Sequence, residues 1–173
     1  MSGHPTCDVV LNFDPSRKFF TAGDDLRGRV CLKTAVEGQL IRHQGIKVSL
    51  LGMILQLQPT AGAMGKNEDG MVTNYNSSRS EITAANIGAY RQYTFMQIQK
   101  VVENAGEFTD FFEVDFTFLK LDEELKEHET YNGIDNFIKY FIKVSMNYEG
   151  GSLVAGRELE KLHEIVVKNR YAL

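Results

Sequence analysis

The sequence predicts an all-β domain, an antiparallel sandwich of two sheets with little helix. Most of the chain alternates apolar and polar residues with a period of two, which is typical of strands buried on one face. Gly, Asn, Asp and Ser stand between these segments, as turns require. One further segment, Ile46 to Leu57, is apolar on both faces. It predicts a strand in the middle of the structure or against a neighbour.

The alternation is clear enough to assign faces. In the segment that starts at Leu26, Leu26, Gly28, Val30 and Leu32 form one face, and Arg27, Arg29 and Lys33 form the other. The same pattern appears from Phe112 to Phe118 and from Phe137 to Tyr148. The expected strands are Cys7 to Phe13, Leu26 to Lys33, Ile46 to Leu57, Gln92 to Val101, Phe112 to Phe118, Phe137 to Tyr148 and His163 to Val167.

Two segments interrupt this pattern. Leu119 to Glu129 has helix formers and Glu-to-Lys pairs at helical spacing, so it predicts either one or two helical turns or a solvated acidic loop. Pro59 to Tyr90 is irregular and rich in Gly, Asn, Ser and Ala. We expect a long loop over about residues 58–91, with a short helix around Glu81 to Ile87. No domain boundary is visible, so residues 1–173 are expected to form one domain.

Composition narrows the classes of function. The net charge of -4 argues against nucleic-acid binding, which needs clustered Lys and Arg. The N-terminus lacks the apolar run of a signal peptide, so we expect a cytosolic protein. The two cysteines, Cys7 and Cys31, are then expected to be reduced and buried.

No pattern predicts catalysis, a metal or a cofactor. The four histidines, His4, His43, His128 and His163, never form a spaced pair, and neither HExxH nor CxxC occurs. The acidic run from Asp122 to Glu129 lacks the spacing of a calcium loop and is typical of a solvated face. We therefore predict a binding protein that is not an enzyme.

Four segments, taken in order, resemble one family. Lys18 to Val30 resembles the second hairpin of arrestin-fold proteins, and Ile41 to Gly52 contains the sequence His-Gln-Gly-Ile. Arg91 to Lys100 is an aromatic strand that contains Met-Gln. Glu129 to Val144 contains Glu-Thr-Tyr-Asn-Gly followed by an aromatic strand. Together they resemble the arrestin-like subunit of retromer, the vacuolar protein sorting-associated protein 26 family.

The resemblance implies an immunoglobulin-like sandwich of the arrestin type, corresponding to the N-terminal domain of that family. The family has two tandem sandwich domains, and the second is absent from residues 1–173. The implied function is a sorting scaffold in the retromer cargo-recognition complex, in endosome-to-Golgi or endosome-to-surface transport. The implied partners are the retromer solenoid subunit, bound through the missing second domain, sorting nexins and cargo tails. The implied location is cytoplasmic and peripheral on endosomal membranes.

Two alternatives remain open at this point. A related subunit of the retriever complex shares the His-Gln-Gly turn, although the aromatic Met-Gln strand favours retromer. The other alternative is a general arrestin-type adaptor that binds receptor tails or ubiquitin ligases. A phosphate-sensing cluster would favour that adaptor, and Arg27, Arg29 and Lys33 are spaced to share one strand face.

The residues that carry the resemblance are expected to be mainly structural. We expect Gly45, Gly52 and Gly133 to serve backbone geometry. His43 and Gln44 are expected to tie a loop to the backbone, and Tyr131 to be buried with a hydrogen-bonded hydroxyl. Strand edges are the expected recognition sites. The site residues singled out are His43, Gln44, Gly45, Tyr93, Phe95, Tyr131 and Gly133.

Overall fold

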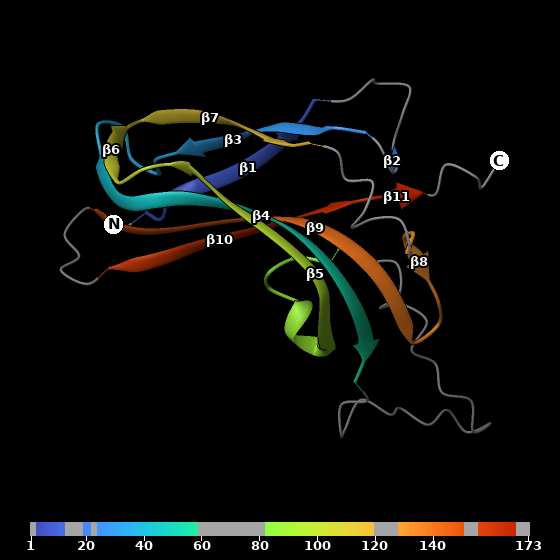
Figure 1. Ribbon diagram of the computed structural model, residues 1–173. Helices are drawn as coiled ribbons and strands as arrows, with labels where there is room; N and C mark the ends of the chain where they lie inside the picture. The colour runs from blue at the N-terminus through green and yellow to red at the C-terminus, as the bar shows by residue number, and fades with distance from the viewer. Residues whose placement is uncertain are drawn as a thin grey trace, which may run out of the picture.

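The computed structural model describes residues 3–12, 19–21, 24–58, 82–119, 128–150 and 156–168. A three-stranded sheet lies against a six-stranded sheet (Figure 1). Within the described ranges there are strands, turns and a single 3-10 turn, and no α-helix. The predicted all-β sandwich with little helix is therefore confirmed.

The three-stranded sheet has the order β1–β3–β7 and is antiparallel. Its strands are β1 (Thr6–Leu11), β3 (Leu26–Lys33) and β7 (Phe111–Phe118). In β3 every second residue from Leu26 to Leu32 is buried and the arginines between them are exposed. The face assignment made from the alternation is therefore confirmed.

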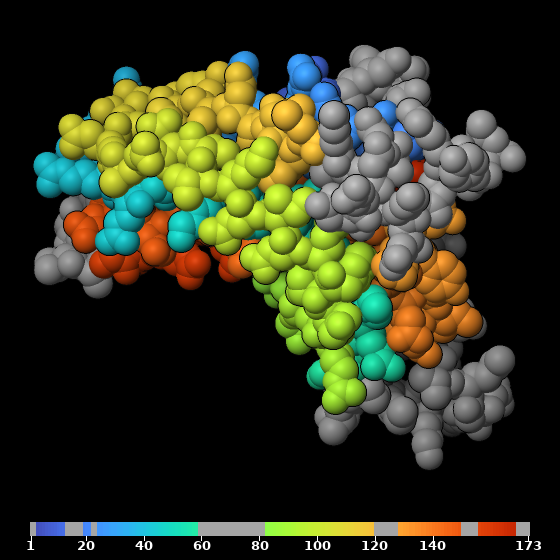
Figure 2. Space-filling model, viewed as in Figure 1, coloured from blue at the N-terminus to red at the C-terminus, as the bar shows by residue number. Residues whose placement is uncertain are grey.

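The six-stranded sheet is built on four long antiparallel strands in the order β10–β9–β4–β5. They are β4 (Leu40–Leu57), β5 (Tyr90–Glu103), β9 (Asn136–Gly150) and β10 (Arg157–Ile165). Two short strands complete it, since β6 (Gly106–Thr109) pairs with β4 and β8 (Tyr131–Asn132) pairs with β9. In Figures 1 and 2, β4, β5 and β9 extend well beyond the layer that contains β7.

Strand β4 explains why one segment is apolar on both faces. Its Val48 and Leu50 side chains are fully buried in the main core between the two sheets. Leu51, Met53 and Leu55 point the other way, into a second cluster with Ile82 and Tyr90. The segment after residue 81 thus covers the back of the sheet, and the predicted central strand is confirmed. Burying each such aliphatic side chain contributes about 1.5–3 kcal/mol.

A short parallel pair was not predicted. Strand β2 (Phe20–Thr21) pairs with β11 (Val167–Lys168), and the Phe20 amide donates to the Val166 carbonyl at 2.8 Å. On the other side of β11, the Thr130 amide donates to the Val167 carbonyl at 2.8 Å. The segment after Ile165 is therefore held between two parts of the chain that are distant in sequence.

Several predicted boundaries change. The strand predicted from His163 to Val167 begins at Arg157 and is interrupted at Val166, whose carbonyl turns toward Phe20. The strand predicted from Ile46 begins at Leu40, because a bulge at Gln44 and Gly45 lets it continue past a break in its pattern.

The helix predictions are also revised. Near Glu81 to Ile87 the structure has a turn followed by the 3-10 helix η2 (Ile87–Ala89), and strand β5 starts at Tyr90, inside the predicted loop. Leu119, His128 and Glu129 are not helical. The rest of both predicted segments, residues 59–81 and 120–127, lies outside the described residues.

Candidate functional site

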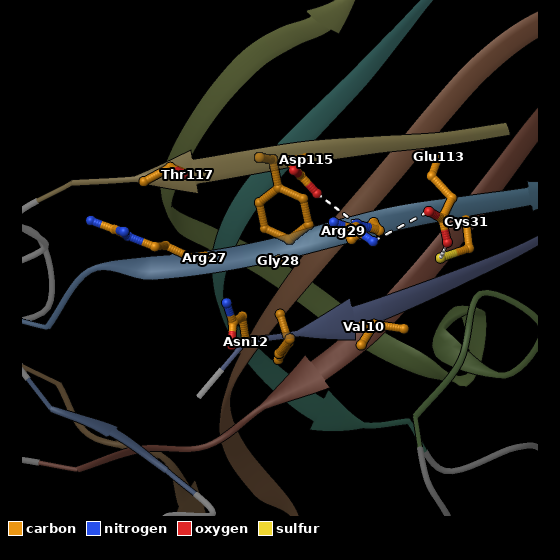
Figure 3. A pocket seen from close by; sticks show the side chains of 11 residues that line it. Val10, Asn12, Arg27, Gly28, Arg29, Cys31, Glu113, Asp115 and Thr117 are labelled. Carbon is orange, nitrogen blue, oxygen red and sulfur yellow. Dashed lines mark hydrogen bonds and ion pairs between the residues drawn. The ribbon is translucent and has the colours of Figure 1, made fainter. Parts of the chain in front are cut away.

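A hollow of ≈ 580 Å³ lies on the outer face of the three-stranded sheet. Figure 3 shows it from nearby, with Arg29 from β3 pointing toward Asp115 and Glu113 from β7. All three strands line it, through Val10, Leu11, Asn12, Arg27, Gly28, Arg29, Cys31, Glu113, Asp115, Phe116 and Thr117. The lining includes both apolar and charged side chains.

The charges on this face neutralise one another. The Arg29 Nε donates to Asp115 Oδ1 at 2.7 Å, and its Nη1 donates to Glu113 Oε2 at 3.2 Å. The hydrogen bond and charge of Asp115, helped by Glu113, raise the pKa of Arg29. Arg27 donates to Asp25 at 3.2 Å. The predicted cluster of Arg27, Arg29 and Lys33 therefore shares one face, but both arginines already have carboxylate partners.

The two thiols lie on opposite faces of this sheet. Cys7 is buried in the core, and burial raises the pKa of its thiol to about 12. Cys31 is only half-buried, contrary to the prediction, because it is on the outer face of β3. Its Sγ donates to Glu113 Oε1 at 3.6 Å, and desolvation and that hydrogen bond raise its pKa. Both thiols are free and poorly nucleophilic.

The His43-Gln44-Gly45 segment forms the bulge in β4. Gly45 has a φ of 118°, a conformation that favours glycine, and its amide donates to His43 Nδ1 at 3.2 Å. The His43 ring is buried beside Phe108 and Phe112, and burial lowers its pKa. The expected tie between His43 and the backbone is thus present in this geometry.

The two aromatic residues of the β5 motif have different environments. Phe95 lies at a second bulge, opposite the step from Gly52 to Met53, and packs edge-on against Tyr140 at 5.8 Å between ring centroids. Gly52 is required there, because a Cβ would lie 2.7 Å from the Phe95 ring. Tyr93 is 64% exposed, so its ring is not part of the core.

Tyr131 does not have the expected environment. Its side chain is 56% exposed, because β8 lies at the projecting end of the six-stranded sheet. Its ring lies close to Gly133, whose amide donates to the Asn136 carbonyl at 2.9 Å. The buried tyrosine of this region is instead Tyr140, whose hydroxyl donates to the His128 carbonyl at 2.5 Å and has its pKa raised to about 12 by burial.

The structure therefore divides the singled-out residues between two places. His43, Gln44 and Gly45 shape one part of β4, whereas Tyr93 and Tyr131 lie near its other end, with Phe95 between them. The sequence reasoning missed the pairing of Arg29 with Asp115, because the register of β3 against β7 cannot be deduced from either segment alone. The opposite charges at alternate positions on the two strands were the available signal.

Two sets of side-chain contacts in the described part of the chain cover strand edges or ends. Lys100 of β5 donates to the Thr117 carbonyl on the edge of β7 at 2.6 Å, and its ammonium lies over the Phe118 ring. At the start of β1, His4 bonds to Tyr148 at 2.8 Å and to Arg157 at 2.6 Å, which fastens the chain to β9 and β10. Such contacts prevent edge-to-edge pairing.

Across the described ranges, no three His, Cys, Asp or Glu side chains are grouped so that they could hold a metal ion. Nor does any helix in those ranges have the length and apolar character needed to cross a membrane. The two carboxylates of the hollow are bonded to Arg29, and desolvation and the hydrogen bond to Glu113 raise the pKa of the Cys31 thiol.

Comparison with known proteins gives one family. The family model described as vacuolar protein sorting-associated protein 26 matches residues 12–171. No curated protein sequence matches the chain. Among solved structures, the chain is similar to Spo0M, a sporulation control protein from Bacillus subtilis, with 13% identity and a TM-score of 0.44. That match covers 95% of this chain and 49% of Spo0M, so the chain spans about half its length.

Proposed function

The chain belongs to the vacuolar protein sorting-associated protein 26 family, and on that premise we propose that it is a non-catalytic subunit of a retromer-type coat. In this role it is a scaffold for endosome-to-Golgi or endosome-to-surface sorting. Its partners are the retromer solenoid subunit, sorting nexins and cargo tails, and it is recruited to the cytoplasmic side of endosomal membranes. The observation that carries the proposal is the family match, which covers every described strand of the sandwich except β1.

Two features of the site favour this role over a phosphate-sensing adaptor. Arg29 is already bonded to Asp115 and Glu113, and Arg27 to Asp25, so binding a phosphate there would require breaking existing ion pairs. The His43 bulge and the Phe95 bulge both shape β4 and β5. These two strands contain two of the four segments that resemble the retromer subunit.

The test is affinity purification of the full-length native gene product from its source cells, with bound proteins identified by mass spectrometry. We expect the retromer solenoid subunit and at least one sorting nexin. A purification from cells that express the affinity tag alone serves as the control. That control should recover neither the solenoid nor a sorting nexin.

The other outcomes separate the alternatives. Recovery of the retriever solenoid in place of the retromer solenoid would support the sorting role and would assign the chain to the retriever complex. Recovery of receptors or ubiquitin ligases without either solenoid contradicts the proposal and favours the general adaptor.

A further inference from the structure

Four exposed or half-exposed side chains form a row across the projecting end of the six-stranded sheet. Tyr93 on β5 pairs with Ile54 on β4, Ile54 pairs with Ile138 on β9, and Ile138 pairs with Tyr131 on β8. Directly paired residues point to the same face of a sheet. Tyr93, Ile54, Ile138 and Tyr131 therefore form one continuous surface, which we name the open row.

The open row continues the core face beyond the part that the three-stranded sheet covers. Leu50, four residues before Ile54 on the same face of β4, is fully buried in the main core. Ile54 is 38% exposed. In Figures 1 and 2 this end of β4, β5 and β9 projects past β7. The same apolar pattern is thus core at one end of the strands and surface at the other.

One end of the row is bordered by the edge of β5 that faces away from β4, along which none of the described strands pairs. The Gln58 amide donates to the Ala89 carbonyl on the β5 side of β4. The Leu57 amide donates to the Asp135 carbonyl on the β9 side. Hydrogen-bonded pairs alternate along an antiparallel ladder. Arg91 and Tyr93 therefore bond to β4, whereas the main-chain groups of Gln92 and Thr94 point away from it, toward the free edge of β5.

This open edge is short and bounded at both ends. The Gln92 side chain donates to the Ile87 carbonyl at 3.1 Å, which fastens the start of β5 to η2. After Thr94 the bulge at Phe95 interrupts the ladder, and further along Lys100 closes the gap to β7. Between these limits the described strand has no lysine, proline or bulge, and its one charged side chain is Arg91.

We propose that the β5 edge from Tyr90 to Thr94 binds a short extended peptide as an added strand, with the open row as the surface that selects its side chains. This proposal does not depend on membership of a retromer-type coat, and peptide binding can be tested on this chain alone. An added strand would form its main-chain hydrogen bonds with Gln92 and Thr94.

The same geometry defines the chemistry of the peptide. Its residue opposite Tyr93 would continue the open row, so an apolar side chain is favoured there. Its residue opposite Arg91 would meet a positive charge. Arg91 is the one charged side chain among the residues that share this face, which are 52, 54, 56, 91, 93, 131, 136 and 138. A carboxylate is favoured at that position. The partner is therefore a segment with an apolar residue and an acidic residue two positions apart.

The test measures binding of fluorescein-labelled nine-residue peptides to this chain by fluorescence anisotropy. The probes contain Glu-Thr-Leu or Leu-Thr-Glu at the centre, for the two strand directions, and Lys replaces Glu in the control probes. We expect at least one Glu probe to bind. Thr94→Pro removes an outward amide without disturbing the ladder to β4, and should weaken binding by about tenfold or more. Thr94→Val keeps the amide and should bind like the parent.

A second variant tests the charge. Arg91→Glu should weaken binding of the Glu probe by about threefold and strengthen binding of the Lys probe. Circular dichroism and the thermal midpoint show whether each variant is folded. If Thr94→Pro unfolds the chain, the parent chain is tested instead with a Glu probe whose central amide nitrogens are methylated. That probe cannot donate these main-chain hydrogen bonds, so its failure to bind supports the proposal equally well.

Three results would overturn the proposal. The first is no binding of any Glu probe up to about 1 mM. The second is binding that Thr94→Pro, or the methylated probe, leaves unchanged, which would mean that the main chain of β5 is not used. The third is a dimer of the chain that Thr94→Pro dissociates, which would make a second copy the occupant of the edge.

Discussion

The outer face of the three-stranded sheet and the open row of the six-stranded sheet are both exposed. They differ in whether their polar groups already have bonding partners within the chain. On the first, Arg29 bonds to Asp115 and Glu113 from the neighbouring strand. On the second, Tyr93 and Tyr131 border two isoleucines, and the edge beside them directs main-chain groups outward. The charged groups of the first face already have partners, whereas none of the described strands pairs with the outer edge of β5 on the second.

This difference shows that charge alone is a poor guide to a recognition surface. Exposed ion pairs contribute little to stability, and they must be broken before a new charged ligand can bind. Exposed tyrosines beside aliphatic side chains are typical of protein interfaces, and an unpaired edge supplies hydrogen bonds at no such cost.

The largest expected effect is on stability. It tests whether the open row lies on the surface while the continuation of the same strand face lies in the core. Leu50→Ala should lower the free energy of unfolding by about 3–4 kcal/mol, because it leaves a cavity between the sheets. Ile54→Ala, on the same face of the same strand, should lower it by about 1 kcal/mol. Urea denaturation measures both. Equal losses would show that the row is covered and would remove the contrast.

The next effect concerns the junction between covered and open regions. A Cβ at Gly52 would lie 2.7 Å from the Phe95 ring and 3.0 Å from Tyr140, so Gly52→Val should lower the free energy of unfolding by about 2 kcal/mol. Gly88→Ala is the control, since its Cβ would meet nothing within 4 Å, and it should change stability by less than about 0.5 kcal/mol. A similar loss in both variants would contradict this packing.

A smaller effect depends on pH. Burial lowers the pKa of His43 in the folded state, opposed in part by Glu103, so the unfolded state binds the proton more readily. This contribution to stability is present above the unfolded pKa of about 6.5 and is lost as the pH falls below it. The thermal midpoint should therefore fall less steeply between about pH 7 and pH 5.5 for His43→Asn than for the parent. Parallel slopes would indicate that His43 has an ordinary pKa.

The smallest effect is expected on the charged face. Reversing the charges of Arg27, Arg29 and Lys33 should leave the binding of phosphopeptides as low as in the parent chain, because both arginines are already occupied by carboxylates. Anisotropy with a phosphoserine peptide and its unphosphorylated twin measures this. Phosphate-dependent binding that the triple reversal abolishes would restore the adaptor hypothesis.

Periodicity was sufficient to predict the long strands. The buried faces of β3, β7 and β9 follow directly from alternating residues, and the central position of β4 follows from a segment that is apolar on both faces. The short strands β2, β6, β8 and β11 could not be predicted, because two to four residues do not establish a period. Their positions depend on long-range pairing, as between Val167 and Phe20.

The candidate site was less predictable than the fold. The motif residues His43 and Gly45 have the structural geometry expected of them, but Tyr131 is exposed where a buried ring was expected. Its exposure depends on how far β9 projects past the other sheet, which no local pattern encodes. Ile54 and Ile138 match core positions in the sequence, and only the end of the three-stranded sheet makes them surface.

The most direct test of the central claim, that recognition occurs at the open row and its edge, is amide hydrogen exchange followed by NMR. The chain is compared with and without a saturating Glu-Thr-Leu or Leu-Thr-Glu probe. We expect new protection at the amides of Gln92 and Thr94 and no change along β3 and β7. Protection that appears instead around Arg29 and Asp115 would contradict the account and transfer recognition to the charged face.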